Sequence, residues 1–582
     1  MKPFLITDCG STTTKALLIG GDRPQEAHLV ASGEAPTTVE APYADVTVGV
    51  LAAIAALEEA CGLHLRVPAG TRPDAAAADY LSTSSAGGGL QMLVAGVVGR
   101  FSAASAERAA LAAGAIVQRT FSVEDGLDAH ERIAELRRLR PDMALLAGGT
   151  DGGGVTHVAE MAELLRAAAP EQRFGGGMRL PVVFAGNTAA RPAVVSVLGD
   201  RCDLRLVDNV RPDLERERLN PARDAIHELF MDHVMARAPG YDRLSAWVAA
   251  PVLPTPAAVG VTVRAVAERL GRDVLAVDIG GATTDVFSVT SGRYHRSVGA
   301  NFGMSYSATQ VLREAGAAAL ARWLPLRMGD REISDRIANK MVRPTTVPAT
   351  PVDLLLEQAL AREALRLALA HHRRTLPPTA PQAGRRRLGD SLAGRRAGAE
   401  CPVGGLSVFG LILGSGGVLS HAPRRAQAAM MLLDAFEPVG VVRLGVDSVF
   451  MLPHLGVLRG RCAEAADAAF WRDCLVPLGT AVAPAGSASA LSILLHLAGG
   501  TQRLTVPRGG LVRVPLVAGE VVRADLAPGR GGDLGAGPGR PVRSELHGGM
   551  VGLLFDCRGR PLPAPERPAQ MAAWLAAAGA WP

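Results

Sequence analysis

The polar stretch Asp8-Cys9-Gly10-Ser11-Thr12-Thr13-Thr14-Lys15 separates two short apolar runs, Pro3 to Thr7 and Ala16 to Ile19. Apolar runs on either side of a short polar turn predict two β-strands joined as a hairpin with a hydroxyl-rich tip. Backbone N–H groups and hydroxyls at such a tip can bind an anion, and Asp8 at the end of the first strand can hold a hydrated divalent cation. The stretch therefore predicts an anion-binding loop beside a cation site.

A second stretch of the same design occurs 270 residues later in the chain. Asp278-Ile279-Gly280-Gly281-Ala282-Thr283-Thr284-Asp285 lies between Val274 to Val277 and Val286 to Val289, and the first aspartate stands eight residues before the resumed apolar run in both copies. Similarity at this separation predicts a duplicated domain. One turn of this composition is often an ordinary turn, but two copies in matching strand–turn–strand context predict nucleotide binding.

Lys15 adds a positive charge to the first of these turns. It is one of only three lysines in the chain, the others being Lys2 and Lys340. Every other residue in the total of lysine and arginine is an arginine. The compact ammonium of lysine suits contact with a β- or γ-phosphate. We therefore single out Lys15 as a candidate phosphate ligand.

The remaining sequence divides into segments of different character, and 582 residues suffice for several domains. Short apolar runs alternate with helical patterns between Leu81 and Asn209, which predicts parallel βα units. These patterns predict an α/β fold with four parts. Residues 1–80 form the first half of the duplicated core, with the first loop, and residues 81–265 form an inserted α/β domain. Residues 266–500 form the second half of the core, with a Pro-, Gly- and Arg-rich insert at 373–405, and residues 501–582 form a small β-rich C-terminal domain.

Composition excludes several classes of protein. The seven cysteines lie far apart without CxxC spacing, which indicates free thiols. The net charge of +5 equals the balance of residues 373–400 alone, which hold seven arginines against two acidic residues, so we expect no nucleic-acid partner. Smooth apolar stretches reach only about ten residues and the N-terminus has no apolar signal core, so we expect no membrane partner and a cytoplasmic location.

The two loops, together with Leu411-Ile412-Leu413-Gly414-Ser415-Gly416-Gly417, resemble the phosphate and adenosine motifs of the actin, Hsp70 and sugar-kinase (ASKHA) ATPase superfamily. Their order and spread along the chain are similar to that superfamily. The resemblance implies a duplicated ribonuclease H-like core that binds ATP and Mg²⁺.

A narrower resemblance lies in four further segments: residues 82–90, 145–153, 184–187 and 303–307. With these segments the chain resembles the glutamate mutase accessory family called GlmL or MutL, which is unrelated to the mismatch-repair protein of that name. The likeness extends from residue 1 to about 495, and 373–400 has no counterpart in it. It implies an ATP-dependent partner of an adenosylcobalamin-dependent mutase, acting as a reactivating chaperone, with ATPase activity and an unspecified oligomeric state.

The superfamily resemblance also implies roles for individual residues. Asp8 and Asp278 would face Mg²⁺ through water, with Asp278 orienting the attacking water. The phosphates would be contacted from the first loop and the second, and a Gly turn would back the adenosine. The residues implied in these contacts are Gly10, Ser11, Thr12, Thr13 and Lys15, then Gly280, Gly281, Thr283 and Thr284, and finally Gly414, Gly416 and Gly417. Hydrolysis at such a site requires positioning and charge stabilisation without a covalent intermediate.

Three alternatives remain open at this stage. Hydantoinase-type enzymes and sugar kinases use similar loops for metabolic reactions, and a nucleotide-binding scaffold could lack turnover. The activator of 2-hydroxyacyl-CoA dehydratases has a similar first turn, but it is shorter and its cysteine pairs have no counterpart here. Two more Gly-rich segments, Leu81 to Leu90 and Gly148 to Gly154, could bind an anion or serve only as tight turns.

Overall fold

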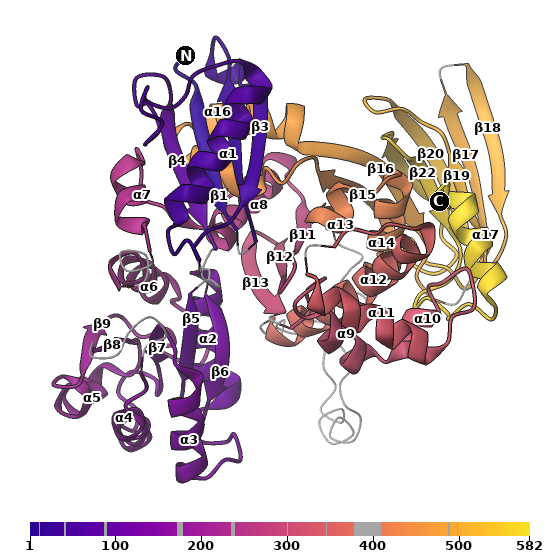
Figure 1. Ribbon diagram of the computed structural model, residues 1–582. Coiled ribbons are helices and arrows are strands. Elements are labelled where there is room, and N and C mark those ends of the chain that lie inside the picture. The colour runs from indigo at the N-terminus through magenta and orange to yellow at the C-terminus, as the bar shows by residue number, and fades with distance from the viewer. Residues whose placement is uncertain are drawn as a thin grey trace, which may run out of the picture. The chain divides into compact units, whose positions relative to one another are not determined.

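The computed structural model describes residues 1–10, 12–39, 42–85, 90–113, 115–171, 179–233, 239–299, 301–344, 346–376, 409–486, 489–497 and 499–581. Contacts divide the chain into two units. The first comprises Met1–Thr262, Arg296–Val298 and Met451–Asp473, and the second comprises Val263–His295, Gly299–Phe450 and Cys474–Pro582. Figure 1 labels many of the elements of the two units. Within the described residues, no helix has the length and hydropathy that crossing a bilayer requires.

A five-stranded sheet begins the first unit. Its order is β10-β4-β1-β2-β3, with bounds Leu253–Pro254, Asp79–Ser84, Phe4–Cys9, Thr13–Gly20 and His28–Pro36. The strands β1, β2 and β3 are successive antiparallel neighbours, whereas β4 runs parallel to β1 and to β10. In order of appearance along the chain, the strands therefore lie as 3-2-1-4-5.

Helices cover this sheet. The helix α1 (Val46–Cys61) packs on β2 and β3, while α15 (Leu452–Arg461) packs on β1 and β4 and is followed by α16 (Ala463–Ala469). The first of these helices begins where the Asp45 carboxylate accepts the Thr47 amide, and it ends at Gly62, whose φ of +71° suits glycine. Of the two strands of the β1–β2 hairpin, β2 therefore packs against α1 and β1 packs against α15.

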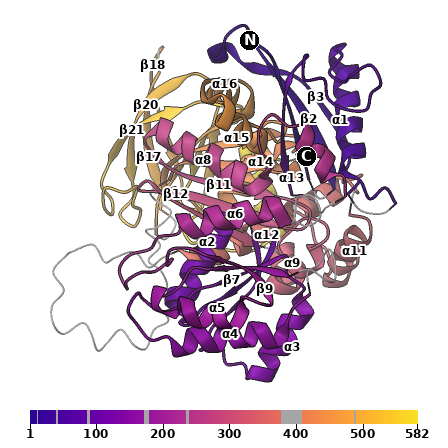
Figure 2. The ribbon, with the colours of Figure 1, turned by 90° about the vertical axis from the view of Figure 1, so that its left-hand side faces the viewer.

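The other sheet of the first unit is wholly parallel, with the order β6-β5-β7-β8-β9 and bounds Ile116–Phe121, Gln91–Ala95, Met143–Leu146, Leu180–Phe184 and Cys202–Leu206. Figure 2 shows α3 (Ala129–Leu139), α4 (Thr156–Ala168) and α5 (Arg191–Leu198) on one face and α2 (Ala104–Ala112) and α6 (Asn220–His233) on the other. The helix α7 (Tyr241–Trp247) follows α6. The parallel βα arrangement predicted between Leu81 and Asn209 is confirmed.

The helix α8 (Thr255–Leu270) runs from the first unit into the second. The main sheet of the second unit has eight strands. Its order is β13-β12-β11-β14-β15-β16-β22-β19, with bounds Arg293–Gly299, Thr284–Thr290, Asp273–Ile279, Phe409–Ser415, Gly440–Asp447, Leu475–Ala483, Gly552–Asp556 and Leu511–Val514. The first five positions repeat the order 3-2-1-4-5. As in the first unit, the central strand pairs antiparallel with β12 and parallel with β14. The predicted duplication is therefore present in the strand order.

The helices of the second unit share its largest core with this sheet. They are α9 (Ala308–Ala315), α10 (Ala317–Ala321), α11 (Asp330–Val342), α12 (Pro351–Thr375), α13 (Gly417–Ser420), α14 (Arg425–Phe436) and α17 (Pro568–Ala578). The helix α12 continues to Thr375, past the predicted start of the insert at 373, and residues 377–408 lie outside the described residues.

A four-stranded antiparallel sheet completes the second unit. Its order is β18-β17-β20-β21, with bounds Gly500–Val506, Leu491–Leu497, Val521–Pro528 and Val542–His547. Residues 501–582 thus divide between two sheets, because β19 and β22 join the eight-stranded sheet while β20 and β21 join the smaller one. The domain boundaries drawn from the sequence stay predictions. The fold class is α/β, with a duplicated core, a parallel α/β insertion and added C-terminal strands.

Candidate functional site

The first predicted loop is a tight turn between β1 and β2. Asp8 stands opposite Lys15 in the antiparallel register, and the Gly10 amide donates to the Thr13 carbonyl at 3.1 Å. A Cβ at Gly10 would lie 2.7 Å from that carbonyl oxygen, so the turn requires glycine here. Ser11, predicted as a ligand, lies outside the described residues.

Thr37 holds the carbonyl groups of this loop. Its hydroxyl donates to the Gly10 carbonyl at 2.8 Å, and its amide donates to the Thr12 carbonyl at 3.0 Å. The same hydroxyl lies 3.0 Å from that of Thr14. The carbonyl oxygens of Gly10 and Thr12 therefore accept hydrogen bonds within the protein. Because these oxygens would repel an anion if they faced it, this arrangement favours anion binding at the loop.

Asp8 is 2% exposed, and its carboxylate lies between two threonines from distant parts of the first unit. Its Oδ1 accepts from Thr83 at 2.7 Å and from Thr255 at 2.5 Å. Burial raises the pKa of Asp8, although the hydrogen bonds from Thr255 and Thr83 and the charge of Lys15 oppose the shift. A cation beside this carboxylate would relieve the cost of burying its charge.

The second oxygen of Asp8 makes the site suitable for a hydrated metal ion. Oδ2 accepts no hydrogen bond from the described residues, whereas Oδ1 accepts two. A single carboxylate oxygen is the kind of ligand that Mg²⁺ takes while keeping most of its waters. Within the described residues no cluster of three or more His, Cys, Asp or Glu side chains forms a cage for a metal.

Lys15 lies on the same face of the hairpin as Asp8. Its ammonium pairs with Glu34 of β3 at 3.1 Å, where the glutamate side chain is 53% exposed. An ion pair with so exposed a partner is worth at most about 1 kcal/mol. Loss of the Glu34 contact alone would therefore cost little.

The second predicted loop repeats the turn of the first. Asp278 stands opposite Asp285 in the register of β11 and β12, and the Gly280 amide donates to the Thr283 carbonyl at 2.9 Å. These positions correspond to Asp8, Lys15, Gly10 and Thr13, so the second copy carries an aspartate where the first has its lysine. The equivalence in register and turn bond extends the duplication from sequence to backbone geometry.

A segment after β13 clamps the second loop. Amides of Met304 and Ser305 donate to the carbonyls of Gly280 and Gly281 at 2.9 and 2.8 Å, and the Ser307 hydroxyl donates to the Ala282 carbonyl at 2.7 Å. The segment approaches so closely that a Cβ at Gly303 would lie 2.4 Å from the Gly281 oxygen. These residues belong to 303–307, which the sequence marked only through its resemblance.

This clamp leaves the loop with donors that point to no protein acceptor. All three carbonyls from Gly280 to Ala282 accept hydrogen bonds, whereas the amides of Gly281, Ala282 and Thr283 have no acceptor among the described residues. Consecutive amides with this property form an anion-binding concavity. A phosphate group would satisfy them.

Thr284 differs from its predicted role as a phosphate ligand. The residue is fully buried, and its hydroxyl donates to the Phe302 carbonyl. Thr283, one residue earlier, is partly exposed at the turn. The structure therefore brings Gly280, Gly281 and Thr283 together in the loop, with the Thr284 hydroxyl engaged behind it.

The third predicted motif lies beside the second loop. Ser415 is the register partner of Asp278 on the neighbouring strand β14, and the turn that follows contacts the end of β11. A Cβ at Gly416, whose φ is +104°, would lie 2.1 Å from the Ile279 oxygen. Gly414 packs against Leu419, while a Cβ at Gly417 would meet nothing within 4 Å. Within the second unit, Asp278, the second loop and this Gly turn therefore meet at the carboxyl ends of adjacent parallel strands.

Sequence reasoning missed several polar residues around these loops. Thr255 and Thr37 carry no local motif, so no signal in the sequence could have linked them to Asp8 and Gly10. Asp447 ends β15 and is fully buried, and its carboxylate accepts from Ser415 at 3.4 Å and Cys474 at 3.6 Å. An aspartate at the end of an apolar run was the available signal.

Packing explains some of the glycines in the segment from Gly148 to Gly154, whereas a Cβ at Gly152 or Gly154 would meet nothing within 4 Å. A Cβ at Gly148 would lie 2.4 Å from Val97, and one at Gly186 would lie 2.8 Å from the Gly148 amide. Asp151 accepts from the Thr188 amide at 3.0 Å and from Asn209 at 3.1 Å, so it links loops after β7, β8 and β9 and does not cap α4. Residues 86–89 lie outside the described residues.

The strand order and paired loops define the class of protein as an α/β chain with a duplicated actin/Hsp70-like ATPase core. The sequence model of the family described as MutL protein matches residues 4–474. A curated relative, Protein MutL of Clostridium tetanomorphum, is 30% identical over 395 residues, which cover 64% of this chain and 79% of the relative. The chain belongs to the MutL family.

Solved structures with similarity to this chain include the three that follow. A nucleotide-free acetone carboxylase is 11% identical with a TM-score of 0.33, covering 86% of this chain and 80% of its own. A glycerol dehydratase reactivase is 11% identical with a TM-score of 0.31, and the match covers 79% of this chain and 100% of the reactivase chain. Xylulose kinase of Bifidobacterium adolescentis is 10% identical with a TM-score of 0.30, and the match covers 82% of this chain and 96% of the kinase chain. Because these scores are low, the fold is assigned from strand order and family membership.

Proposed function

We propose that this protein binds ATP with Mg²⁺ through its two hairpin loops and hydrolyses it as an accessory protein of an adenosylcobalamin-dependent mutase such as glutamate mutase. The observation that carries the proposal is the repeated loop, in which carbonyls are bonded within the protein and amides of the second copy are left for an anion. Membership of the MutL family supports the choice of a mutase as partner.

The proposed roles follow from the contacts of each residue. Asp8 would hold hydrated Mg²⁺ with its carboxylate, while Thr83 and Thr255 fix one of its oxygens. Lys15 exchanges Glu34 for the phosphates, and the amides of the second loop bind phosphate oxygens. When bound, Mg²⁺ supplies neutralisation of phosphate charge. Catalysis would then consist of positioning and charge stabilisation, with Asp278 orienting the attacking water.

The Gly turn at 414–417 serves the nucleoside in this proposal. Its backbone is exposed to close approach at Gly417, where no atom lies within 4 Å of a Cβ position. Gly416 maintains the turn against the end of β11. The turn and the second loop lie together at the ends of adjacent strands, where ligands bind in α/β proteins.

A cofactor-exchange assay tests the accessory role. A purified adenosylcobalamin-dependent mutase would be inactivated with a tightly bound damaged corrinoid, then incubated with this protein, free adenosylcobalamin and ATP. We expect mutase activity to return with ATP and not with a non-hydrolysable analogue. We expect Asp8→Asn to abolish the recovery, whereas Asp22→Asn, the same change at an exposed position of the first unit, leaves it intact.

A binding assay with the same mutase complements this experiment. We expect the amount of mutase retained on the immobilised protein to differ between ATP and ADP, because turnover in such folds is coupled to conformational change. Retention that does not depend on the nucleotide, together with no recovery of activity, would favour an ATP-dependent metabolic enzyme or a scaffold.

A further inference from the structure

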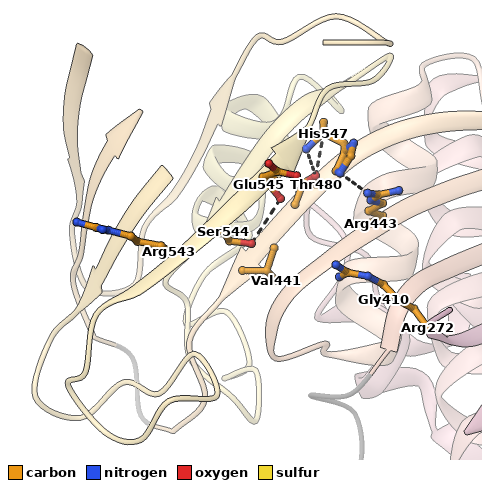
Figure 3. A pocket seen from close by; sticks show the side chains of 9 residues that line it. All are labelled: Arg272, Gly410, Val441, Arg443, Thr480, Arg543, Ser544, Glu545 and His547. Atoms are coloured by element: carbon orange, nitrogen blue, oxygen red, sulfur yellow. Dashed lines mark hydrogen bonds between the residues drawn. The ribbon is translucent and has the colours of Figure 1, made fainter. Parts of the chain in front are cut away.

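A cavity of about 300 Å³ lies in the second unit between the eight-stranded sheet and β21 of the smaller sheet. Figure 3 shows the side chains around it. They come from the start of β11, from β14, β15 and β16, and from β21: Arg272, Gly410, Val441, Arg443, Thr480, Arg543, Ser544, Glu545 and His547. Its size is at the lower end of small-molecule sites, which range from roughly 300 to 1,000 Å³.

The cavity carries an excess of positive charge. Neither Arg272 nor Arg443 forms an ion pair with a carboxylate of the described residues, whose pairs in this region are those of Arg523 and Arg543, and Figure 3 shows both guanidinium groups on the same side of the cavity. The one acidic lining residue, Glu545, pairs at 3.8 Å with Arg523, which does not line the cavity, and its charge also acts on Arg443 and His547. Arg543 points away from the cavity and pairs with Asp525 at 2.8 Å.

The charges of the two arginines affect each other and their neighbour, and the charge of Glu545 opposes this effect in part. Burial, and then the charge of Arg272, lowers the pKa of Arg443. His547 hydrogen-bonds to the Arg443 guanidinium, and burial followed by the Arg443 charge lowers the pKa of the imidazole. Like charges held close at a partly buried position are unfavourable unless an anion neutralises them.

The backbone is arranged to hold these side chains. Arg443 of β15 stands opposite both Leu411 of β14 and Thr480 of β16 in the sheet register. Gly410 is the extra residue where the register between β11 and β14 shifts. A Cβ there would lie 2.7 Å from Cδ of Arg272, so glycine makes room for the arginine stem to cross the sheet.

His547 is fixed by two backbone contacts as well. Its amide donates to the Thr480 hydroxyl at 2.8 Å, and its carbonyl accepts from that hydroxyl at 2.8 Å. The ring is therefore presented to Arg443 from a strand locked to β16. This arrangement is preorganised rather than dependent on a loose side chain.

We propose that this cavity is a binding site for the phosphate group of a small anionic ligand, held by the guanidinium groups of Arg272 and Arg443 beside His547. Guanidinium groups bind phosphate through paired N–H donors and remain charged at all physiological pH values. The site is separate from the proposed nucleotide loop, because Arg272 precedes β11 whereas Asp278 stands near its other end, about 20 Å away at roughly 3.3 Å per residue.

Thermal unfolding of the full chain in phosphate and in chloride at equal ionic strength tests the proposal. We expect inorganic phosphate to raise the Tm of the wild-type protein as its concentration increases, because a ligand that binds only the folded state stabilises it. We expect Arg443→Gln and Arg272→Gln each to remove most of that rise. Arg543→Gln is the matched control and should retain it, since this arginine points away.

Direct titration with inorganic phosphate and with glycerol phosphate distinguishes free phosphate from a phosphate ester. Tighter binding of either supports the site and identifies its preferred form, with at least tenfold weaker binding expected in each arginine variant. If Arg443→Gln fails to fold, Arg272→Gln, at an exposed position, provides the same comparison. The proposal is overturned by an absence of phosphate binding in the wild type, or by binding that persists in both variants, which would place the anion elsewhere.

Discussion

Gly416 occupies a backbone conformation that other residues adopt only with strain, with φ of +104° and no room for a Cβ beside Ile279. We expect Gly416→Ala to destabilise the second unit by about 1–3 kcal/mol from backbone strain alone, with the steric clash adding to it. Urea unfolding measures the loss. Gly417→Ala is the matched control, since its Cβ meets no atom within 4 Å, and a similar loss in both variants would contradict the assignment.

His372 is a buried histidine whose Nε2 lies 2.8 Å from the Ser288 hydroxyl. Burial, with the nearby His295 and His371, lowers the pKa of His372 from 6.5 to about 3. The unfolded chain then binds a proton at a higher pH than the folded chain does. Stability from this group is complete above pH 6.5 and is lost as the pH falls from 6.5 towards 3.

Stability measured against pH tests this linkage. Between pH 6.5 and pH 5 we expect the single histidine to cost about 2 kcal/mol of unfolding free energy. His372→Gln should remove this component, so its stability relative to wild type should improve as the pH falls through that range. His421→Gln, at an exposed position, is the control. An unchanged difference between wild type and His372→Gln at both pH values would contradict the account.

At the residue scale, the sequence marked the residues of the loops but not the groups that hold them. Asp8 and Gly10 could be identified because each belongs to a short turn motif repeated at Asp278 and Gly280. The hydroxyl of Thr255 reaches Asp8 from 247 residues away, and that contact depends on the pairing of β10 with β4. Such partners are set by tertiary structure, which no local pattern encodes.

The Gly303–Ser307 segment acts as a structural element that fixes the second loop through its carbonyls. We expect Ser307→Ala to weaken ATP binding several-fold, because one net hydrogen bond is worth about 1 kcal/mol and the loop amides lose orientation. Calorimetric titration with MgATP provides the measurement. The control is Ser334→Ala, which removes an exposed hydroxyl bond within α11, and equal effects of the two changes would contradict the clamp's role.

At the element scale, both hairpins were predictable, because apolar runs flanking a polar turn decide strand pairing and register. The clamp was not, since 303–307 follows β13 and contacts the loop only once that strand has returned along the sheet. The extent of α12 was also longer than the pattern indicated: its last turn carries Arg373 and Arg374, which the composition had placed in the Arg-rich insert. Basic residues in a last helical turn are favoured by the helix dipole.

A buried charged network joins the C-terminal segment of the second unit to its helices. Asp434 of α14 pairs with Arg362 of α12 at 2.8 Å and with Arg558 at 2.9 Å, and Arg558 in turn pairs with Asp556 at 2.8 Å. Arg560 also contacts Asp556 at 2.7 Å. Burial opposes ionisation of Asp556, but Arg558 and Arg560 outweigh it and hold the pKa of this carboxyl far below its usual value.

Removal of one charge from this network should affect the second unit as a whole. We expect Asp556→Asn to reduce the unfolding free energy by about 3–5 kcal/mol, because it leaves buried guanidinium groups without their counter-charge. Thermal unfolding at neutral pH measures the effect. Asp335→Asn breaks only an exposed pair in α11 and should change Tm little. A small effect of Asp556→Asn would show that the network does not secure the C-terminal segment.

At the scale of the whole molecule, the duplicated α/β core was predictable from two similar stretches of sequence. The division of residues 501–582 between two sheets was not, because β19 and β22 pair with strands distant in sequence. The arginine-lined cavity was equally hidden, since its residues come from five strands or their flanks. The net charge of +5 had been traced to residues 373–400, most of which lie outside the described residues, so it gave no indication of this local excess.

Calorimetric titration with MgATP tests the central claim, that two matching hairpin loops bind the nucleotide. The account predicts saturable one-site binding by the wild-type chain. It predicts at least tenfold weaker binding in Asp8→Asn and in Asp278→Asn, and unchanged binding in Asp22→Asn and Asp335→Asn, which make the same change at exposed positions. An absence of heat with the wild type, or full affinity in both loop variants, would contradict it.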